Sequence, residues 1–106
     1  MNPIRLSICI CTINRVEFIR ETLDSIVPQL TDEVELIVID SSSDSATEDV
    51  IRSFEGRGNV VYLRRNLNFG EAYSKAVEMA RGVYCWLFTD DDLLKPGAIA
   101  AVDRHL

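Results

Sequence analysis

The stretch VYCWLFTDDD, residues 83–92, places an apolar run directly before Thr89 and three consecutive acids. A short apolar run bounded by a glycine and by charged residues is typical of a buried strand. Open α/β sheets bind ligands at the carboxyl ends of their strands. Adjacent carboxylates repel one another unless a cation joins them, and their hard oxygens favour Mg²⁺, Mn²⁺ or Ca²⁺. We therefore interpret Asp90, Asp91 and Asp92 as a candidate metal site, with a solvated acidic turn as the alternative.

The rest of the chain alternates between apolar runs and helical patterns. Four apolar runs are expected to be strands: residues 6–11, 34–39, 60–63 and 83–88. Between and after them, apolar residues at helical spacing predict helices at residues 18–30, 50–54 and 71–81, with a fourth beginning near Pro96. Ser45 and Glu48 have the spacing of a capping box. Strands that are apolar at nearly every position indicate a mostly parallel, doubly wound α/β sheet covered on both faces.

Composition narrows the functional classes. The chain has 106 residues, 47% of them hydrophobic, which is enough for one domain with a modest core. A net charge of −6 argues against nucleic acid as a partner, since phosphates require a basic surface. No apolar stretch is long enough to span a membrane. Cys9, Cys11 and Cys85 lack the spacing of a zinc site and are expected to be buried, reduced thiols.

The loops that follow parallel strands lie along one rim of the sheet. That rim would gather four polar loops: residues 12–15, 40–44, 66–70 and 90–92. Their hydroxyls, amides, guanidinium and carboxylates suit a sugar-bearing diphosphate. A diphosphate approaching an acidic pocket is repelled unless a divalent cation bridges its oxygens to the carboxylates. The metal and the diphosphate therefore imply each other.

Three positions on this rim have two interpretations each. Asp40 ends a strand where acids of dinucleotide folds bind ribose, and it can equally serve as a helix cap or loop anchor. Arg15 either binds phosphate or is solvated at a helix start. If residues 90–92 stay extended, Asp90 and Asp92 point to one side and Asp91 to the other, whereas a turn would change that assignment.

The chain resembles the N-terminal half of the family 2 glycosyltransferases, which are inverting enzymes of the GT-A fold. The resemblance covers nearly all of the chain and rests on four stretches: SICICTINR (7–15) with the helix EFIRETLDSI (17–26), ELIVIDSSSDSATEDVI (35–51), NLNFGEAYSKAVEMARGVYCWLFTDDD (66–92) and LLKPGAI (93–99). It implies transfer of a sugar from a nucleotide diphosphate sugar to an acceptor hydroxyl, with inversion and with Mn²⁺ or Mg²⁺ as cofactor. Uridine diphosphate is the first expected nucleotide, and thymidine or guanosine diphosphate stay open.

The resemblance also implies roles for individual residues. The acid triplet overlies the family's Asp-Xaa-Asp signature, whose closing acid binds the metal, so Asp91 or Asp92 would hold it. Ser41 stands where many members have a second acid that touches the base. The expected nucleotide-binding residues are Thr12, Asn14, Arg15, Asp40, Ser41 and Asp90.

The family's catalytic domain is about twice as long as this chain, within ordinary domain limits. Residues 1–106 would then be the donor-binding part of a longer domain, and the general base would lie beyond Leu106. We expect this part alone to bind nucleotide without transferring sugar. We also expect it to self-associate through an exposed sheet edge. The full-length protein is expected in the cytoplasm, either free or at the membrane surface. A non-catalytic nucleotide-binding module stays open. A receiver-type signalling domain is disfavoured because Thr12 stands where its acid belongs.

Overall fold

The computed structural model describes residues 3–106 and contains one four-stranded sheet. The strands are β1 (Leu6–Thr12), β2 (Val34–Asp40), β3 (Val60–Arg64) and β4 (Tyr84–Phe88). They are all parallel and lie in the order β3-β2-β1-β4. The helices are α1 (Val16–Ile26), the 3-10 turn η1 (Val27–Gln29), α2 (Ala46–Arg52), α3 (Phe69–Met79) and α4 (Ala98–Arg104). This arrangement confirms the predicted α/β class and parallel sheet.

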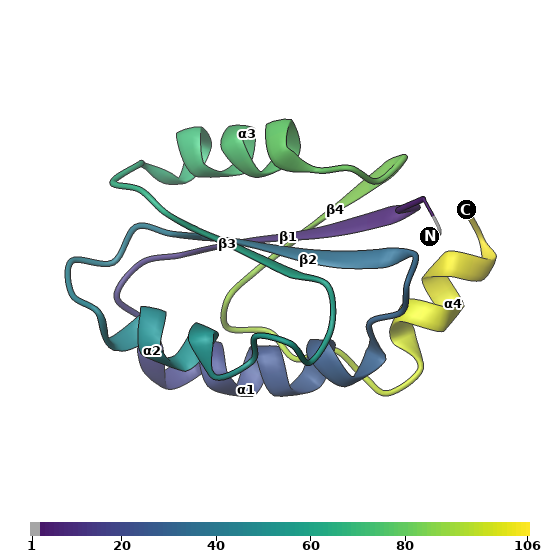
Figure 1. The fold of residues 1–106 in the computed structure, drawn as a ribbon, viewed down its shortest axis with the longest axis horizontal. Helices are drawn as coiled ribbons and strands as arrows, with labels where there is room; N and C mark the ends of the chain where they lie inside the picture. Colours follow the sequence, from purple (N-terminus) through teal and green to yellow (C-terminus); the bar gives the residue numbers. More distant parts are fainter. Residues whose placement is uncertain (1–2) are drawn as a thin grey trace.

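Helices cover both faces of the sheet, as Figure 1 shows: α1 and α2 lie on one face and α3 on the other. Alternate side chains of β1 serve the two faces. Ile8 and Ile10 pack in the core cluster that contains Leu23 of α1, whereas Cys9 and Cys11 pack in the cluster that contains α3. Ala72 and Ala76 of α3 are buried in this second cluster. Both faces of the two central strands are therefore dry.

The sequence-based expectation for residues 83–88 was wrong in one respect, because β4 is not buried. It pairs only with β1 among the described strands and forms one edge of the sheet. Val83 and Leu87 are 78% and 55% exposed, and the Cys85 thiol is exposed as well, unlike Cys9 and Cys11. Burial raises the pKa of the Cys9 and Cys11 thiols to about 12 in both cases. The apolar sheet edge foreseen from the sequence is present, and self-association through it stays a prediction.

Helix starts also differ from expectation. Ser45 precedes α2 but its side chain makes no capping hydrogen bond, and the N–H of Ala46 donates to the Asp44 carboxylate instead. The complete capping box is at α3, where Asn68 accepts from the Glu71 N–H and Glu71 accepts from the Asn68 N–H. Asn-x-x-Glu has the same spacing as Ser-x-x-Glu, so the same reasoning applied to α3 finds it.

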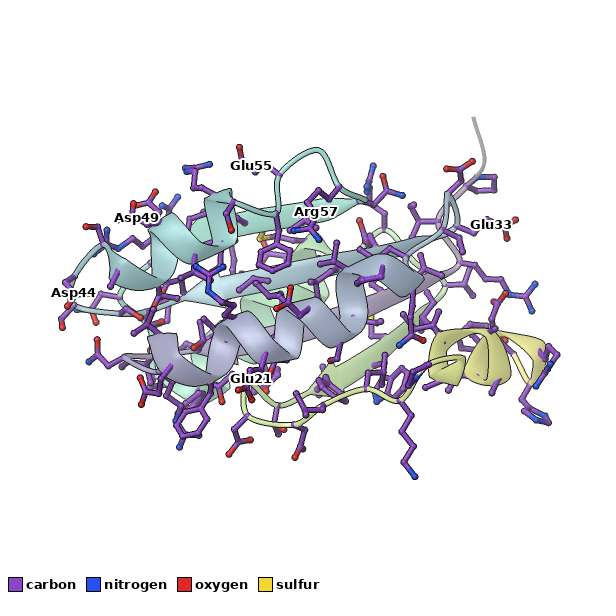
Figure 2. The ribbon with its side chains drawn as sticks, turned by 90° about the horizontal axis from the view of Figure 1, so that it is seen from below. Glu21, Glu33, Asp44, Asp49, Glu55 and Arg57 are labelled. Carbon is purple, nitrogen blue, oxygen red and sulfur yellow. The ribbon has the colours of Figure 1, made fainter. Side chains whose placement is uncertain are left out.

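Acidic side chains gather on the outside of the face covered by α1 and α2. Figure 2 looks at this face, and Glu21, Asp44, Asp49 and Glu55 are all exposed there. These carboxylates are solvated, so this part of the negative net charge does not require a bound ligand. Among residues 3–106, no helix combines the length and apolar content that a membrane crossing requires.

Gly82→Ala is expected to destabilise the chain by about 1–3 kcal/mol, because the added methyl group overpacks a tight contact. A Cβ at Gly82 would lie 2.6 Å from Ser7 Oγ and 2.8 Å from the Ser7 backbone nitrogen. The matched control is Gly70→Ala in α3, whose Cβ would meet only Asn68 Oδ1 at 3.4 Å. Urea unfolding of both variants measures the difference, and equal midpoints would contradict the prediction.

Candidate functional site

Three adjoining hollows lie at the carboxyl ends of the strands. The acid hollow has a volume of about 330 Å³ and is lined by Cys11, Arg15, Phe69, Tyr73, Thr89, Asp90 and Asp91. The apolar hollow, of about 260 Å³, is lined by Cys11, Thr12, Ile13, Ser41, Leu67, Asn68, Phe69 and Ala72. The polar hollow, of about 460 Å³, is lined by Ile13, Asn14, Ser41, Ser42, Ser43, Arg64, Arg65 and Asn66. Shared lining residues join the first to the second and the second to the third.

Asp90 is the buried member of the acid triplet, at 5% exposure. Its carboxylate accepts a hydrogen bond of 2.9 Å from Thr12 Oγ1. Arg15 reaches across from the start of α1, with Nη1 3.5 Å from Asp90 and 3.1 Å from Asp91. Burial raises the pKa of Asp90 above its ordinary value, and the Thr12 hydrogen bond and the Arg15 charge oppose that rise. The structure thus brings together four predicted site residues, Thr12 of β1, Arg15 of the β1–α1 loop, and Asp90 and Asp91 after β4.

The triplet itself turns instead of continuing the strand. Residues 90 and 91 form a turn, so the alternation expected for an extended segment does not occur. Asp91 faces Arg15, whereas Asp92 accepts a hydrogen bond from Thr89, and both acids are exposed. Within residues 3–106, no three His, Cys, Asp or Glu side chains are gathered closely enough to enclose a metal ion by themselves.

A polar stripe on α1 and η1 holds the backbone around the triplet. Thr22 Oγ1 lies 2.9 Å from each of the carbonyl oxygens of Asp90 and Asp92. Ser25 Oγ accepts from the Leu94 N–H at 2.9 Å. Gln29 Nε2 donates to the Lys95 carbonyl, and its Oε1 accepts from the Ile99 N–H. Sequence reasoning missed this stripe, whose i, i+3, i+7 spacing would suit one helix face.

Thr22→Val is expected to loosen residues 90–92, because valine keeps the shape of threonine and loses the donor. The carbonyl of Asp90 would then lack its partner in a buried position, at a cost of about 1–3 kcal/mol. Amide hydrogen exchange of residues 90–95 should become faster than in the unchanged chain. Thr22→Ser keeps the hydroxyl and serves as the matched control, and faster exchange in Thr22→Ser to the same degree would contradict the role of the hydroxyl.

Asn14 joins the loop after β1 to the loop after β2. Its side-chain oxygen accepts from the Ser43 N–H and Ser43 Oγ at 3.0 and 3.1 Å, and its own N–H donates to Ser42 Oγ. Asn14 has a φ of 51°, a left-handed conformation that asparagine tolerates better than most residues. This predicted site residue therefore shapes the wall between the two loops.

Asp40 is fully buried, and both of its carboxylate oxygens already have partners. Tyr62 donates to one oxygen at 2.6 Å and the Ser42 N–H donates to the other at 2.9 Å. This arrangement fits the loop-anchor alternative, and ribose binding by Asp40 stays a prediction. Ser41, the neighbouring predicted residue, lines both the apolar and the polar hollow.

Two basic residues at the end of β3 also reach the rim and were not among the predicted site residues. Arg64 pairs with Glu48 at 3.2 Å and approaches the Ser42 carbonyl, and Arg65 is exposed beside it in the polar hollow. The rim rule that selected residues 66–70 would have included them if it had been applied to the end of the strand itself. They give this acidic chain local positive charge next to the loops.

The chain matches a known family over almost its whole length. The sequence profile described as "Glycosyl transferase family 2" matches residues 7–104. The abequosyltransferase RfbV of Salmonella typhimurium is 33% identical, over 95% of this chain and 32% of its own length. The chain thus spans about a third of the curated relative it matches.

Solved structures share the fold at lower sequence identity. The S. aureus TarS fragment 1-349 in complex with UDP-GlcNAc has a TM-score of 0.85 and 21% identity, covering 95% of this chain and 30% of that one. The mannosyltransferase PcManGT of Pyrobaculum calidifontis, in complex with GDP-Man and Mn²⁺, has a TM-score of 0.77 and 22% identity, covering 95% and 32%. At these identities the likeness establishes the fold alone.

Proposed function

Because the chain belongs to the family 2 glycosyltransferases, we propose that it forms the donor-binding part of an enzyme that transfers a sugar from a nucleotide diphosphate sugar to an acceptor hydroxyl, with inversion. The observation that carries this proposal is the meeting of Arg15, Asp90 and Asp91 in one hollow at the carboxyl edge of the sheet. The names of the relatives and the ligands of the solved neighbours support it.

The donor is proposed to lie along the joined hollows. Its diphosphate would occupy the acid hollow beside Arg15, and its nucleoside would extend past Ile13 and Ser41. The polar groups that line this path include Thr12 and the Asn14 loop. UDP is the first candidate because a solved neighbour binds UDP-GlcNAc, and GDP follows because another binds GDP-Man.

A divalent cation fits the donor set of the acid hollow. Mg²⁺ is usually held by one or two carboxylates together with substrate phosphates, not by a complete protein cage. Asp91 lines this hollow and Asp92 is the next residue in the chain; both are exposed carboxylates, and either could supply the protein ligand. The cation would neutralise the diphosphate leaving group. Arg15 would bind phosphate oxygens from the other side, and Asp90, fixed by Thr12, would hold the turn in place.

Calorimetric titration of the 106-residue chain with UDP, GDP and TDP tests this proposal. UDP should bind more tightly in Mn²⁺ than in EDTA by about tenfold, within the usual range of coupling between two ligands. Equal affinity in Mn²⁺ and EDTA would contradict metal-assisted binding. In a longer protein that contains this chain, donor binding without sugar release would favour the non-catalytic module.

A further inference from the structure

We infer that Arg15 is an internal counter-ion of the acid hollow, which occupies the carboxylates until a nucleotide diphosphate and a divalent cation displace it together. The inference rests on the proposed function and deepens it, because it says that the cation and the diphosphate bind together and that the cation alone binds poorly. Its starting point is a contact pattern: one guanidinium nitrogen of Arg15 lies within 3.5 Å of Asp90 and within 3.1 Å of Asp91.

The position of Arg15 is explained by these acids and not by its helix. Arg15 is the N-cap residue of α1, and its side chain makes no capping hydrogen bond. The amino end of a helix carries partial positive charge, so a second positive charge there is unfavourable without an anion. Asp90 and Asp91 supply that anion in the described chain.

The same contact limits what a cation alone can do. A Mn²⁺ ion that approaches Asp91 meets a carboxylate already partly neutralised by Arg15, and it is repelled by the guanidinium. A diphosphate changes this balance because its negative charge can pair with the Arg15 guanidinium as well as with Mn²⁺. Arginine suits that exchange, since its planar guanidinium binds phosphate oxygens as well as carboxylates. Arg15 therefore passes from the acids to the diphosphate when the metal takes Asp91 or Asp92.

This exchange predicts effects of opposite sign for one substitution. In Arg15→Ala, Mn²⁺ without nucleotide should bind about fivefold to tenfold more tightly, because the competing charge is gone. UDP in saturating Mn²⁺ should bind about tenfold more weakly, because a charged partner of the diphosphate is lost. Arg15→Lys keeps a positive charge and should leave the affinity for Mn²⁺ alone close to that of the unchanged chain. Arg20→Ala removes an exposed arginine of the same helix and should alter neither affinity.

The Mn²⁺ arm is measured by electron paramagnetic resonance of the free ion, and the UDP arm by calorimetry. Unchanged Mn²⁺ affinity in Arg15→Ala, or a change of the same sign in both arms, overturns the inference. If the unchanged chain fails to bind UDP in Mn²⁺, the proposed function is overturned, whereas the Mn²⁺ arm still reports whether Arg15 masks the acids. Thermal unfolding of each variant shows that the fold is kept.

Discussion

Arg81→Ala is expected to lower the free energy of unfolding by about 3 kcal/mol, because it leaves a buried carboxylate without its charged partner. Glu35 lies in β2 with 0% exposure. Three nitrogens of Arg81 contact the Glu35 carboxylate: the backbone N–H at 2.8 Å, Nε at 3.0 Å and Nη2 at 2.9 Å. The other partner of Glu35 is Ser7 Oγ at 2.6 Å, which in turn accepts from the Gly82 N–H. The cluster ties β1 and β2 to the segment between α3 and β4.

A second substitution separates the loss of the charged partner from simple loss of packing, because it should raise stability in the Arg81→Ala chain. Adding Glu35→Gln to Arg81→Ala should restore part of the lost stability, because a neutral amide costs less to bury than an unpaired carboxylate. In the presence of Arg81, Glu35→Gln alone should destabilise. Urea unfolding of the four chains measures this cycle. Lys75→Ala, which removes an exposed ion pair with Glu78 on α3, should change stability by less than about 0.5 kcal/mol. A double variant less stable than Arg81→Ala would contradict the explanation.

The strand pattern predicted all four strands, but it predicted burial well for the two central strands and poorly for the edge strand β4, for a physical reason. Every residue of β1 and β2 is buried. Most of them are apolar, and the few polar ones have hydrogen-bond partners. The run at residues 83–88 is just as apolar, but β4 has a single neighbour, β1, within the described residues. Local periodicity reports the propensity to form a strand, whereas the number of neighbouring strands depends on segments far away in the chain.

The rim of the sheet was predictable because parallel topology alone decides which loops meet. This rule predicted that Arg15 lies at the same rim as the acid triplet, and in the structure Arg15 contacts Asp90, 75 residues later in the sequence. What it could not give was the supporting layer. Thr22 and Gln29 look like ordinary polar positions of a helix, and their partners are backbone groups 66 to 70 residues later, which no side-chain pattern records. Thr22 contacts the backbone on both sides of the turn at residues 90–91, and the sequence alone left open whether these residues are extended or turned.

Asp91→Ala combined with Asp92→Ala is expected to abolish the Mn²⁺-dependent part of UDP binding, so the affinity for UDP in Mn²⁺ should fall by about tenfold, to its value in EDTA. Removing only the hydrogen-bond partners of metal ligands typically lowers the affinity for the metal by about 10- to 100-fold, so removing the carboxylates themselves should lower the affinity for Mn²⁺ at least as much. Affinity measured in EDTA should stay the same or rise, because the two acids repel the diphosphate when no cation is present. Calorimetry in Mn²⁺ and in EDTA separates these two effects.

The matched control is Asp32→Ala with Glu33→Ala, which removes an adjacent acid pair, also exposed, just before β2 at the amino ends of the strands and away from the acid hollow. The net charge changes by the same amount in both double variants, so a long-range effect of charge would appear in both. Unchanged Mn²⁺ dependence in the Asp91/Asp92 variant would reject the metal site. The single variants then decide between the two acids, since Asp91 pairs with Arg15 and Asp92 with Thr89, and Mn²⁺ would compete with one of these contacts. If Asp91 is the ligand, its release frees Arg15 for the diphosphate, and Asp91→Ala should be the more damaging of the two substitutions.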